Sequence, residues 1–218
     1  MKFLRKKISV LTGIFGDFDE VPPVPFGFDE AILISDKSIK SEWTNVILNL
    51  DFISPRLCSK IPKFRPDLFT SNAISVWIDA SIRDPENWLH KASMHKIRNS
   101  EMVLFKHPER TNVFEESLYS RDLRKYKNFQ LDKQVNTYQE LPSFDGNNLY
   151  AGGVIVRRDT SKLENFGNEW FMENTVHSIQ DQLSLPHLIK KHKINLAIFE
   201  ENLFSGPLKF VKHKINDY

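Results

Sequence analysis

Residues 75–81, SVWIDAS, place a carboxylate directly after an apolar run. Asp79 ends that run, and the next two residues, Ala80 and Ser81, are small enough to leave room for a ligand against the backbone. A carboxylate at a strand end can bind Mg²⁺ or Mn²⁺, which prefer oxygen ligands, and the Ser81 hydroxyl can reach the same ion directly or through water. Asp and Ser also end strands in simple turns, so that alternative stays open.

Four basic residues precede this strand within residues 56–65, RLCSKIPKFR: Arg56, Lys60, Lys63 and Arg65. Arginine and lysine at the mouth of a phosphate site neutralise a diphosphate and hold it in register. A solvated helix face has the same composition. The segment is therefore a candidate diphosphate site, with an exposed helix as its alternative.

Two further segments carry residues suited to a polar substrate. Gly152 and Gly153 open the β-branched run YAGGVIVRR, where glycine marks close approach of a ligand or a bulge. Asp181 and Gln182 lead an apolar helical pattern in SIQDQLSLPHL. These two side chains either satisfy the first backbone donors of a helix or hydrogen-bond a polyhydroxylated substrate.

Two of the seven histidines lie where they could face a ligand. His107 ends a predicted strand in FKHPER and is a candidate for substrate binding, and His213 lies in KFVKHK, which resembles a late strand. A satisfied or solvent-facing role is the alternative for each. The chain has no HExxH, GxSxG, GxGxxG or GxxxxGK[ST] motif. The sequence therefore gives no support for a zinc protease, a serine hydrolase, a Rossmann dinucleotide site or a P-loop.

The elements that must position these residues alternate between strand and helix patterns. Strand-like runs cover residues 8–13, 31–36, 74–79, 102–107 and 151–158. Helix-like patterns cover residues 85–97, 112–126, 160–176 and 179–192, the first with Asp84 as N-cap and Pro85 at its first position. This alternation predicts an α/β layer structure with a mainly parallel sheet. Ligands of such sheets bind at the carboxyl ends of the strands, where Thr12, Gly13, Asp36 and Asp79 fall.

Composition limits the classes of function. The 218 residues fit one globular domain, which could be the first domain of a longer protein. Thirty Lys and Arg face 28 Asp and Glu, a net charge of +2 that gives no basis for bulk nucleic-acid binding. Cys58 is the only cysteine, which favours a reducing, cytosol-like compartment, and no apolar run nears the roughly 18 residues of a membrane span. We expect a cytoplasmic monomer.

In this order, the segments resemble nucleotide-sugar glycosyltransferases of the GT-A fold. KIPKFRPDLFTSNAISVWIDAS, HPERTNVFEE and IQDQLSLPHLIKK are similar to a group of plant and bacterial glycosyltransferases with a Trp-Ile-Asp strand and an Arg-Asp-Gln-Leu-Ser segment. Most of the chain also resembles the amino-terminal domain of a chlorella-virus glycosyltransferase that modifies the major capsid protein. The resemblance implies a GT-A, Rossmann-like three-layer sandwich and, for a viral protein, the host cytoplasm.

The resemblance assigns roles to residues at the donor end of the site. Asp79 occupies the place of the family's Asp-x-Asp, with Ser81 instead of the second Asp. It implies Mn²⁺ or Mg²⁺ bound by Asp79 and Ser81, with His213 as a late ligand. The donor nucleotide is expected at Thr12, Gly13, Asp36, Arg56, Lys60, Arg65, Asp79, Ala80 and Ser81.

The same resemblance assigns Gly152, Gly153, Asp181 and Gln182 to the sugar and acceptor segment. Asp181 is the candidate base, or the carboxylate that stabilises a cationic sugar, and Asp79 is the second catalytic candidate. Gln180 stands where the plant and bacterial group has Arg, so the charge around Asp181 differs.

The expected function is metal-assisted transfer of a sugar from a nucleotide donor to a glycan or glycoprotein hydroxyl. A UDP-sugar is the expected donor, with a hexose or a deoxyhexose such as rhamnose as the transferred sugar. A sugar nucleotidyltransferase is one alternative, although the opening loop TGIFGDFDE is acidic. A non-catalytic nucleotide- or glycan-binding module is the other, because the second Asp is missing.

Overall fold

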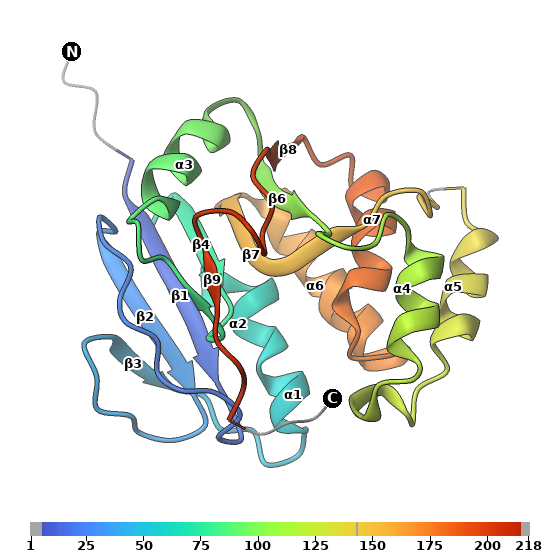
Figure 1. Ribbon diagram of the computed structural model, residues 1–218, viewed down its shortest axis with the longest axis horizontal. Coiled ribbons are helices and arrows are strands. Elements are labelled where there is room, and N and C mark those ends of the chain that lie inside the picture. The colour runs from blue at the N-terminus through green and yellow to red at the C-terminus, as the bar shows by residue number, and fades with distance from the viewer. Residues whose placement is uncertain (1–5, 143, 215–218) are drawn as a thin grey trace.

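A seven-stranded sheet forms the centre of the computed structural model, which describes residues 6–142 and 144–214 (Figure 1). The strands follow the order β3-β2-β1-β4-β7-β6-β8, and all are parallel except β7, which runs antiparallel to both of its neighbours. Their bounds are Ile8–Ile14 (β1), Glu30–Ser35 (β2), Thr44–Ile47 (β3), Ile74–Ile78 (β4), Met102–Lys106 (β6), Tyr150–Arg158 (β7) and Leu196–Phe199 (β8). The predicted α/β class with a mainly parallel sheet is confirmed.

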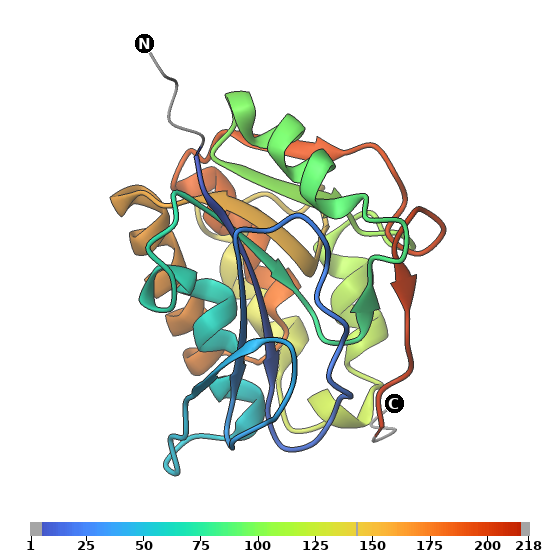
Figure 2. The ribbon, with the colours of Figure 1, turned by 90° about the vertical axis from the view of Figure 1, so that its left-hand side faces the viewer.

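A second, two-stranded sheet joins a short segment after β4 to the carboxyl-terminal part of the chain. It pairs β5 (Ile82–Arg83) antiparallel with β9 (Lys209–Phe210). The pairing lays the red carboxyl-terminal segment beside β5, along the right-hand edge of the view in Figure 2. The late strand predicted around His213 is therefore short and ends at Phe210.

The helices lie between these strands along the chain. Their bounds are Pro55–Cys58 (α1), Lys60–Phe64 (α2), Leu89–Lys96 (α3), Val113–Ser120 (α4), Leu131–Gln139 (α5), Ser161–Val176 (α6) and Asp181–Lys191 (α7). Short 3₁₀ turns cover Pro66–Leu68 (η1), Ile97–Asn99 (η2) and Arg124–Tyr126 (η3).

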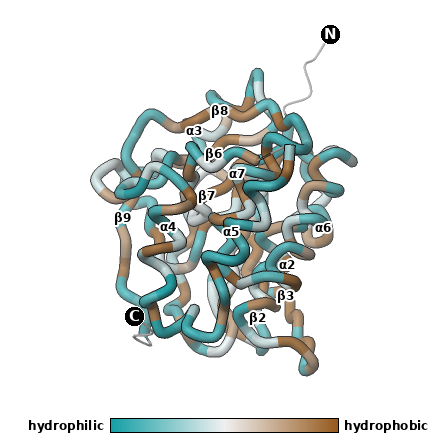
Figure 3. Tube along the Cα trace, turned by 90° about the vertical axis from the view of Figure 1, so that its right-hand side faces the viewer, coloured by the Kyte–Doolittle hydropathy of each residue, from teal (hydrophilic) through white to brown (hydrophobic). Residues whose placement is uncertain are grey.

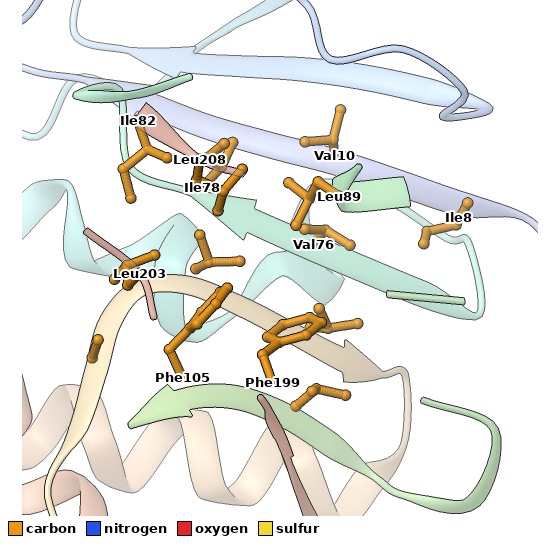
Figure 4. Close-up of a cluster of buried hydrophobic side chains, with 14 of the residues drawn as sticks. Ile8, Val10, Val76, Ile78, Ile82, Leu89, Phe105, Phe199, Leu203 and Leu208 are labelled. Atoms are coloured by element: carbon orange, nitrogen blue, oxygen red, sulfur yellow. The ribbon is translucent and has the colours of Figure 1, made fainter. Parts of the chain in front are cut away.

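Alternating side chains of the strands build two cores on opposite faces of the sheet. Ile8 and Val10 of β1 and Val76 of β4 point to the face covered by α3 and by the chain around Leu203 and Leu208 (Figure 4). Leu11, Trp77 and Ile155 point to the other face, where they meet side chains of α2, α6 and α7. The alternation follows from the two-residue period of a strand, and it gives a three-layer structure.

A smaller apolar cluster lies beside the main sheet. Val113 of α4, Leu131 and Val135 of α5 and Leu183 of α7 pack together in it. Both hydrophilic and hydrophobic residues occur along α4 and α5 (Figure 3). This cluster holds the β6–β7 connection against the start of α7.

One predicted helix start is wrong. The helix expected from Pro85 begins at Leu89, because Asn87 adopts a left-handed backbone with φ of 53°. Asp84 still satisfies donors of that first turn: its carboxylate accepts from the backbone N–H groups of Trp88 at 2.9 Å and Leu89 at 3.0 Å. The chain between Asp84 and Leu89 is a turn.

Gly167 allows α6 to pack closely on the end of α2. A Cβ at this position would lie 2.1 Å from the carbonyl oxygen of Phe64 and 2.9 Å from Cδ of Arg65. Backbone atoms cannot give way by that much, so the contact requires glycine. It matters for the rest of the molecule because α2 carries Lys60 and Lys63.

We expect Gly167→Ala to lower the free energy of unfolding by about 2 kcal/mol through overpacking. Without the clash it would raise stability, since Ala exceeds Gly in helix propensity by about 1 kcal/mol. Urea denaturation followed by circular dichroism measures the change. Met172→Ala, on the exposed side of the same helix, is the control and should leave stability nearly unchanged. Equal stability of Gly167→Ala and wild type would contradict the close packing of α6 on α2.

Candidate active site

A cleft of about 590 Å³ opens at the carboxyl ends of β1 and β4. Strand order reverses between these two strands, since β2 and β3 lie beyond β1 on one side and β4 lies on the other. This is the crevice in which open α/β sheets bind their ligands. Residues of α1 and α2, the first half of β7, the first turn of α7, the 3₁₀ turn η3 and the carboxyl-terminal segment also line it.

The reversed direction of β7 brings its glycines to this edge of the sheet. Gly152 and Gly153 are the third and fourth residues of β7, and a strand that runs antiparallel to its neighbours begins where those neighbours end. The backbone N–H of Asp79 donates to the carbonyl oxygen of Gly153 at 2.8 Å, so the two segments are directly joined. The bulge alternative is borne out for these residues: the β6–β7 register shifts between the pairs Phe105–Ala151 and Val103–Val156, and Gly152 and Gly153 lie in the stretch of β7 between them.

Asp79 is held at the strand end by the residue two places before it. The indole N–H of Trp77 donates to Oδ1 of Asp79 at 2.6 Å, and the Trp77 ring itself is buried. The carboxylate remains about a third exposed toward the cleft (37%). Trp77 therefore fixes the orientation of a carboxylate that ligands can still reach.

Two lysines of α2 and two carboxylates form a buried charge network, here called the lysine–aspartate network. Lys63 Nζ lies 2.7 Å from Oδ2 of Asp181 and 3.5 Å from Oδ1 of Asp79. Lys60 Nζ donates to the same Oδ2 of Asp181 at 2.8 Å. Because Lys60 and Lys63 are three positions apart on a helix, both reach the first residue of α7.

The network sets the charge states of its members. Burial raises the pKa of the Asp181 carboxyl, but the two ammonium groups lower it by more, so its pKa is held far below the usual range. Burial lowers the pKa of Lys63, and Asp181 and Asp79 raise it by more, which leaves it above its usual value. For Lys60 burial outweighs Asp181, and the pKa is lowered. Asp181 is therefore an ionised carboxylate and a weak base.

Further cations line the cleft on the side of α1 and η3. The guanidinium of Arg56 lies over the ring of Phe18, 4.7 Å from its centroid. Burial, together with the neighbouring charges of Lys60 and Arg56, lowers the pKa of Lys125 to about 8. Positive charges gathered this closely are suited to an anionic ligand.

The carboxyl-terminal segment forms the outer wall. Phe204, Phe210, Val211, Lys212 and His213 all line the cleft, and the segment is fastened at both sides of it. The Val211 N–H donates to the carbonyl of Ser81 at 2.8 Å. His213 Nδ1 lies 2.6 Å from Oδ1 of Asp19, and this hydrogen bond raises the pKa of the histidine.

The cleft brings together most of the residues singled out from the sequence. Those that line it are Gly13, Arg56, Lys60, Asp79, Ala80, Ser81, Gly152, Gly153, Asp181, Gln182 and His213. Their ligand-binding roles stay predictions. Four others lie outside its walls: Thr12, Asp36, Arg65 and His107.

Thr12 and Asp36 lie behind the cleft. Thr12 is fully buried in β1, and its hydroxyl has no hydrogen-bond partner in the described part of the chain. Oδ2 of Asp36 accepts the backbone N–H of Gly16 at 2.7 Å, which fixes the turn carrying Phe18 and Asp19 to the cleft. Gly16 needs its freedom there, since its φ is +65°.

Arg65 and His107 are engaged elsewhere. Arg65 is the residue after α2 and turns away from the cleft to pair with Asp67, with Nη2 and Oδ2 2.6 Å apart. His107 is buried and accepts the Arg110 backbone N–H at Nδ1. Burial and then Arg110 lower the pKa of His107 to about 4, so the imidazole is neutral.

Several cleft residues carried no clear signal in the sequence. Lys63 belonged to the basic cluster but not to the predicted site, and Lys125 lies in the surface-like run RDLRKYK. Phe204 and Phe210 are exposed aromatic residues near the carboxyl end of the chain. The three-residue spacing of Lys60 and Lys63 was the available signal, because it places both on one helix face.

The predicted metal ligands do not form a dense cluster. Within residues 6–142 and 144–214, no three His, Cys, Asp or Glu side chains gather in a group that could hold a metal ion. Asp79, Ser81 and His213 all line the cleft, but His213 is bonded to Asp19.

A family model for the TOD1/MUCI70 glycosyltransferase-like domain matches residues 28–213. The chain belongs to this family. The TOD1/MUCI70 match begins just before β2 and ends at His213, so it contains the lysine–aspartate network and the outer wall but not Gly13 of β1. No curated protein matches the chain. Among the described residues of this TOD1/MUCI70 domain, none of the helices is long and apolar enough to cross a membrane.

Removing the carboxylate of Asp181 should destabilise the protein, because Lys60 and Lys63 would stay buried without it. We expect Asp181→Asn to lower the free energy of unfolding by about 3 kcal/mol, since it leaves buried ammonium groups without their shared partner. Chemical denaturation at neutral pH measures the loss. Asp17→Asn breaks the exposed pair of Asp17 with Lys37 and should change stability by no measurable amount. Equal effects of the two substitutions would contradict the network.

Proposed function

We propose that this protein is a GT-A-type glycosyltransferase that moves a sugar from a nucleoside diphosphate to a hydroxyl group of a glycan or glycoprotein. A UDP-sugar is the proposed donor. The observation that carries the proposal is the cation-rich cleft at the point where the strand order reverses. The chain's membership of the TOD1/MUCI70 glycosyltransferase-like family supports it. The arrangement supports binding of an anionic, polar ligand rather than an apolar one.

The transfer breaks the bond between the anomeric carbon and a diphosphate oxygen, and the bonding electron pair leaves with the diphosphate. The acceptor oxygen forms the new bond to the anomeric carbon, and its proton passes to the departing diphosphate or to solvent. Positive charge grows on the sugar and negative charge on the leaving group. Groups already fixed in the site can stabilise both without reorganising.

Asp181 is suited to the sugar end of this reaction. Its pKa is held low, so it stays ionised while positive charge develops beside it. The same property makes it a poor acceptor for the proton of the attacking hydroxyl. Of the two roles expected for Asp181 from the sequence, we therefore propose the stabilising one.

Asp79 is the proposed second carboxylate. It is oriented by Trp77 and open to the cleft, and it lies beside Lys63. Gly152 and Gly153 leave the adjacent surface free of side chains, which allows a sugar ring to approach the backbone. The aromatic wall of Phe204 and Phe210 is available for the acceptor.

The first test is to measure release of UDP from UDP-sugars. A thermal-shift scan of UDP, GDP, CDP and ADP then identifies which nucleobase the donor carries. We expect a rise in melting temperature with one of these nucleotides, because a ligand stabilises the state that binds it. Asp79→Asn keeps the oxygen that accepts from Trp77, so it should fold normally and lose about 100-fold in turnover. Full turnover in this variant would remove Asp79 from the mechanism, and no shift with any nucleotide would contradict the proposed function.

Donor binding should also depend on pH through Lys125. Its pKa of about 8 means that it loses its proton as pH rises through that value. An anionic donor binds best to the protonated form, so affinity should be high at pH 7 and fall between about pH 7 and 9. Isothermal titration of UDP over this range measures it.

Lys125→Arg is the matched control for this prediction, because a guanidinium stays protonated throughout. The variant should retain its affinity for UDP above pH 8. A pH profile that is the same in wild type and Lys125→Arg would assign the titration to another group, such as His213.

A further inference from the structure

The residues at the candidate metal position are poorly suited to a divalent ion. Oδ1 of Asp79 already accepts the Trp77 indole N–H and faces the Lys63 ammonium at 3.5 Å. Ser81 offers a neutral hydroxyl, and His213 is paired with Asp19. A hard divalent cation needs several oxygen ligands with negative charge, and here one carboxylate is shared with a lysine. The donor set does not fit such an ion.

The Lys63 ammonium takes the place that a bridging cation would need. It lies between Oδ2 of Asp181, at 2.7 Å, and Oδ1 of Asp79, at 3.5 Å. A divalent ion bound to Asp79 would lie about 2.1 Å from a carboxylate oxygen and hence within a few ångströms of this ammonium. At such separations inside a protein the repulsion is large. The cation between these two carboxylates is thus a lysine side chain.

The fold keeps this ammonium in place. A Cβ on Gly152 would lie 3.2 Å from Nζ of Lys63 and 3.4 Å from Oδ2 of Asp181. A side chain at position 152 would therefore crowd the ion pair. Glycine at this position accommodates the lysine as well as a ligand.

The cleft has more positive than negative charge. Three aspartates line it, Asp19, Asp79 and Asp181. Five basic residues line it as well: Arg56, Lys60, Lys63, Lys125 and Lys212. Five minus three leaves an excess of two positive charges, before His213 is counted. This excess is of the size needed to balance the diphosphate of a sugar nucleotide.

The lysines also retain hydrogen-bonding capacity. An ammonium has three N–H donors. In the described part of the chain, Asp181 takes one from Lys60, while Asp181 and Asp79 face two of those on Lys63. The remaining donors can reach phosphate oxygens without breaking the network.

We propose that Lys60 and Lys63 supply the countercharge for the diphosphate leaving group, so that donor binding does not require a divalent cation. This inference rests on the proposed function and names the groups that perform one of its steps. The ammonium groups stabilise the negative charge left on the diphosphate when the bond to the sugar breaks. Asp181 pairs with both ammonium groups through Oδ2 and faces the sugar.

The test is the affinity of UDP, measured by isothermal titration in EDTA and again in MnCl₂. We expect wild-type protein to bind UDP with similar affinity in both. Lys63→Gln should weaken binding in EDTA by about tenfold or more, because a charge-assisted contact is lost. Lys63→Arg keeps the charge and should bind UDP in EDTA.

Lys96→Gln is the matched control, since Lys96 lies on α3 and pairs with Glu200 away from the cleft. It should bind UDP as wild type does. Circular dichroism and the melting temperature establish that each variant is folded. If Lys63→Arg binds UDP and Lys63→Gln does not, the loss of affinity is due to the missing charge. Unchanged affinity in folded Lys63→Gln would overturn the inference.

A second probe, inorganic pyrophosphate, distinguishes failure of the inference from failure of the proposed function. UDP binding that appears only with MnCl₂ would overturn the inference and leave the function standing. Binding of pyrophosphate but not UDP in EDTA, lost in Lys63→Gln, would support the lysine site and exclude the proposed uridine donor. No binding of either probe under either condition would overturn both.

Discussion

The salt bridges that Lys60 and Lys63 make with Asp181 are the interaction on which the rest of the site depends. Burying two ammonium groups is unfavourable unless carboxylates meet them at close range. Three elements must therefore agree: α2 must present both lysines on one face, α7 must begin at Asp181, and β7 must have a glycine at position 152. The helix packing at Gly167 and the apolar cluster beside α7 hold these elements at that distance.

Much of the fold was predictable from the sequence, because its strands are buried on both faces and read as apolar runs. β1, β2, β4, β6 and β7 lie within about a residue of their predicted bounds. The direction of β7 was not predictable, since apolar periodicity is the same for parallel and antiparallel strands. Yet that direction decides that Gly152 and Gly153 belong to the cleft. The helix start at Pro85 failed for a local reason, the left-handed backbone of Asn87.

The candidate site was predictable where a residue ends a strand or begins a helix, as Asp79 and Asp181 do. It was not predictable where the direction of a side chain decides whether the residue reaches the cleft. Arg65 follows Lys63 by two positions and points to Asp67 instead of the cleft, although both belong to one basic cluster. Lys125 reaches the cleft from a turn whose composition is that of an ordinary surface. Such cases depend on packing between distant segments, which local patterns do not encode.

The cleft draws its walls from Gly13 near one end of the chain and from His213 near the other. Contacts so distant in sequence form late, because the loop between them must close first. During synthesis on the ribosome, the strands up to β7 are made before the residues of the outer wall. A growing chain therefore lacks a complete ligand site until His213 has been added, so a ligand of the cleft would stabilise only chains that have passed this point.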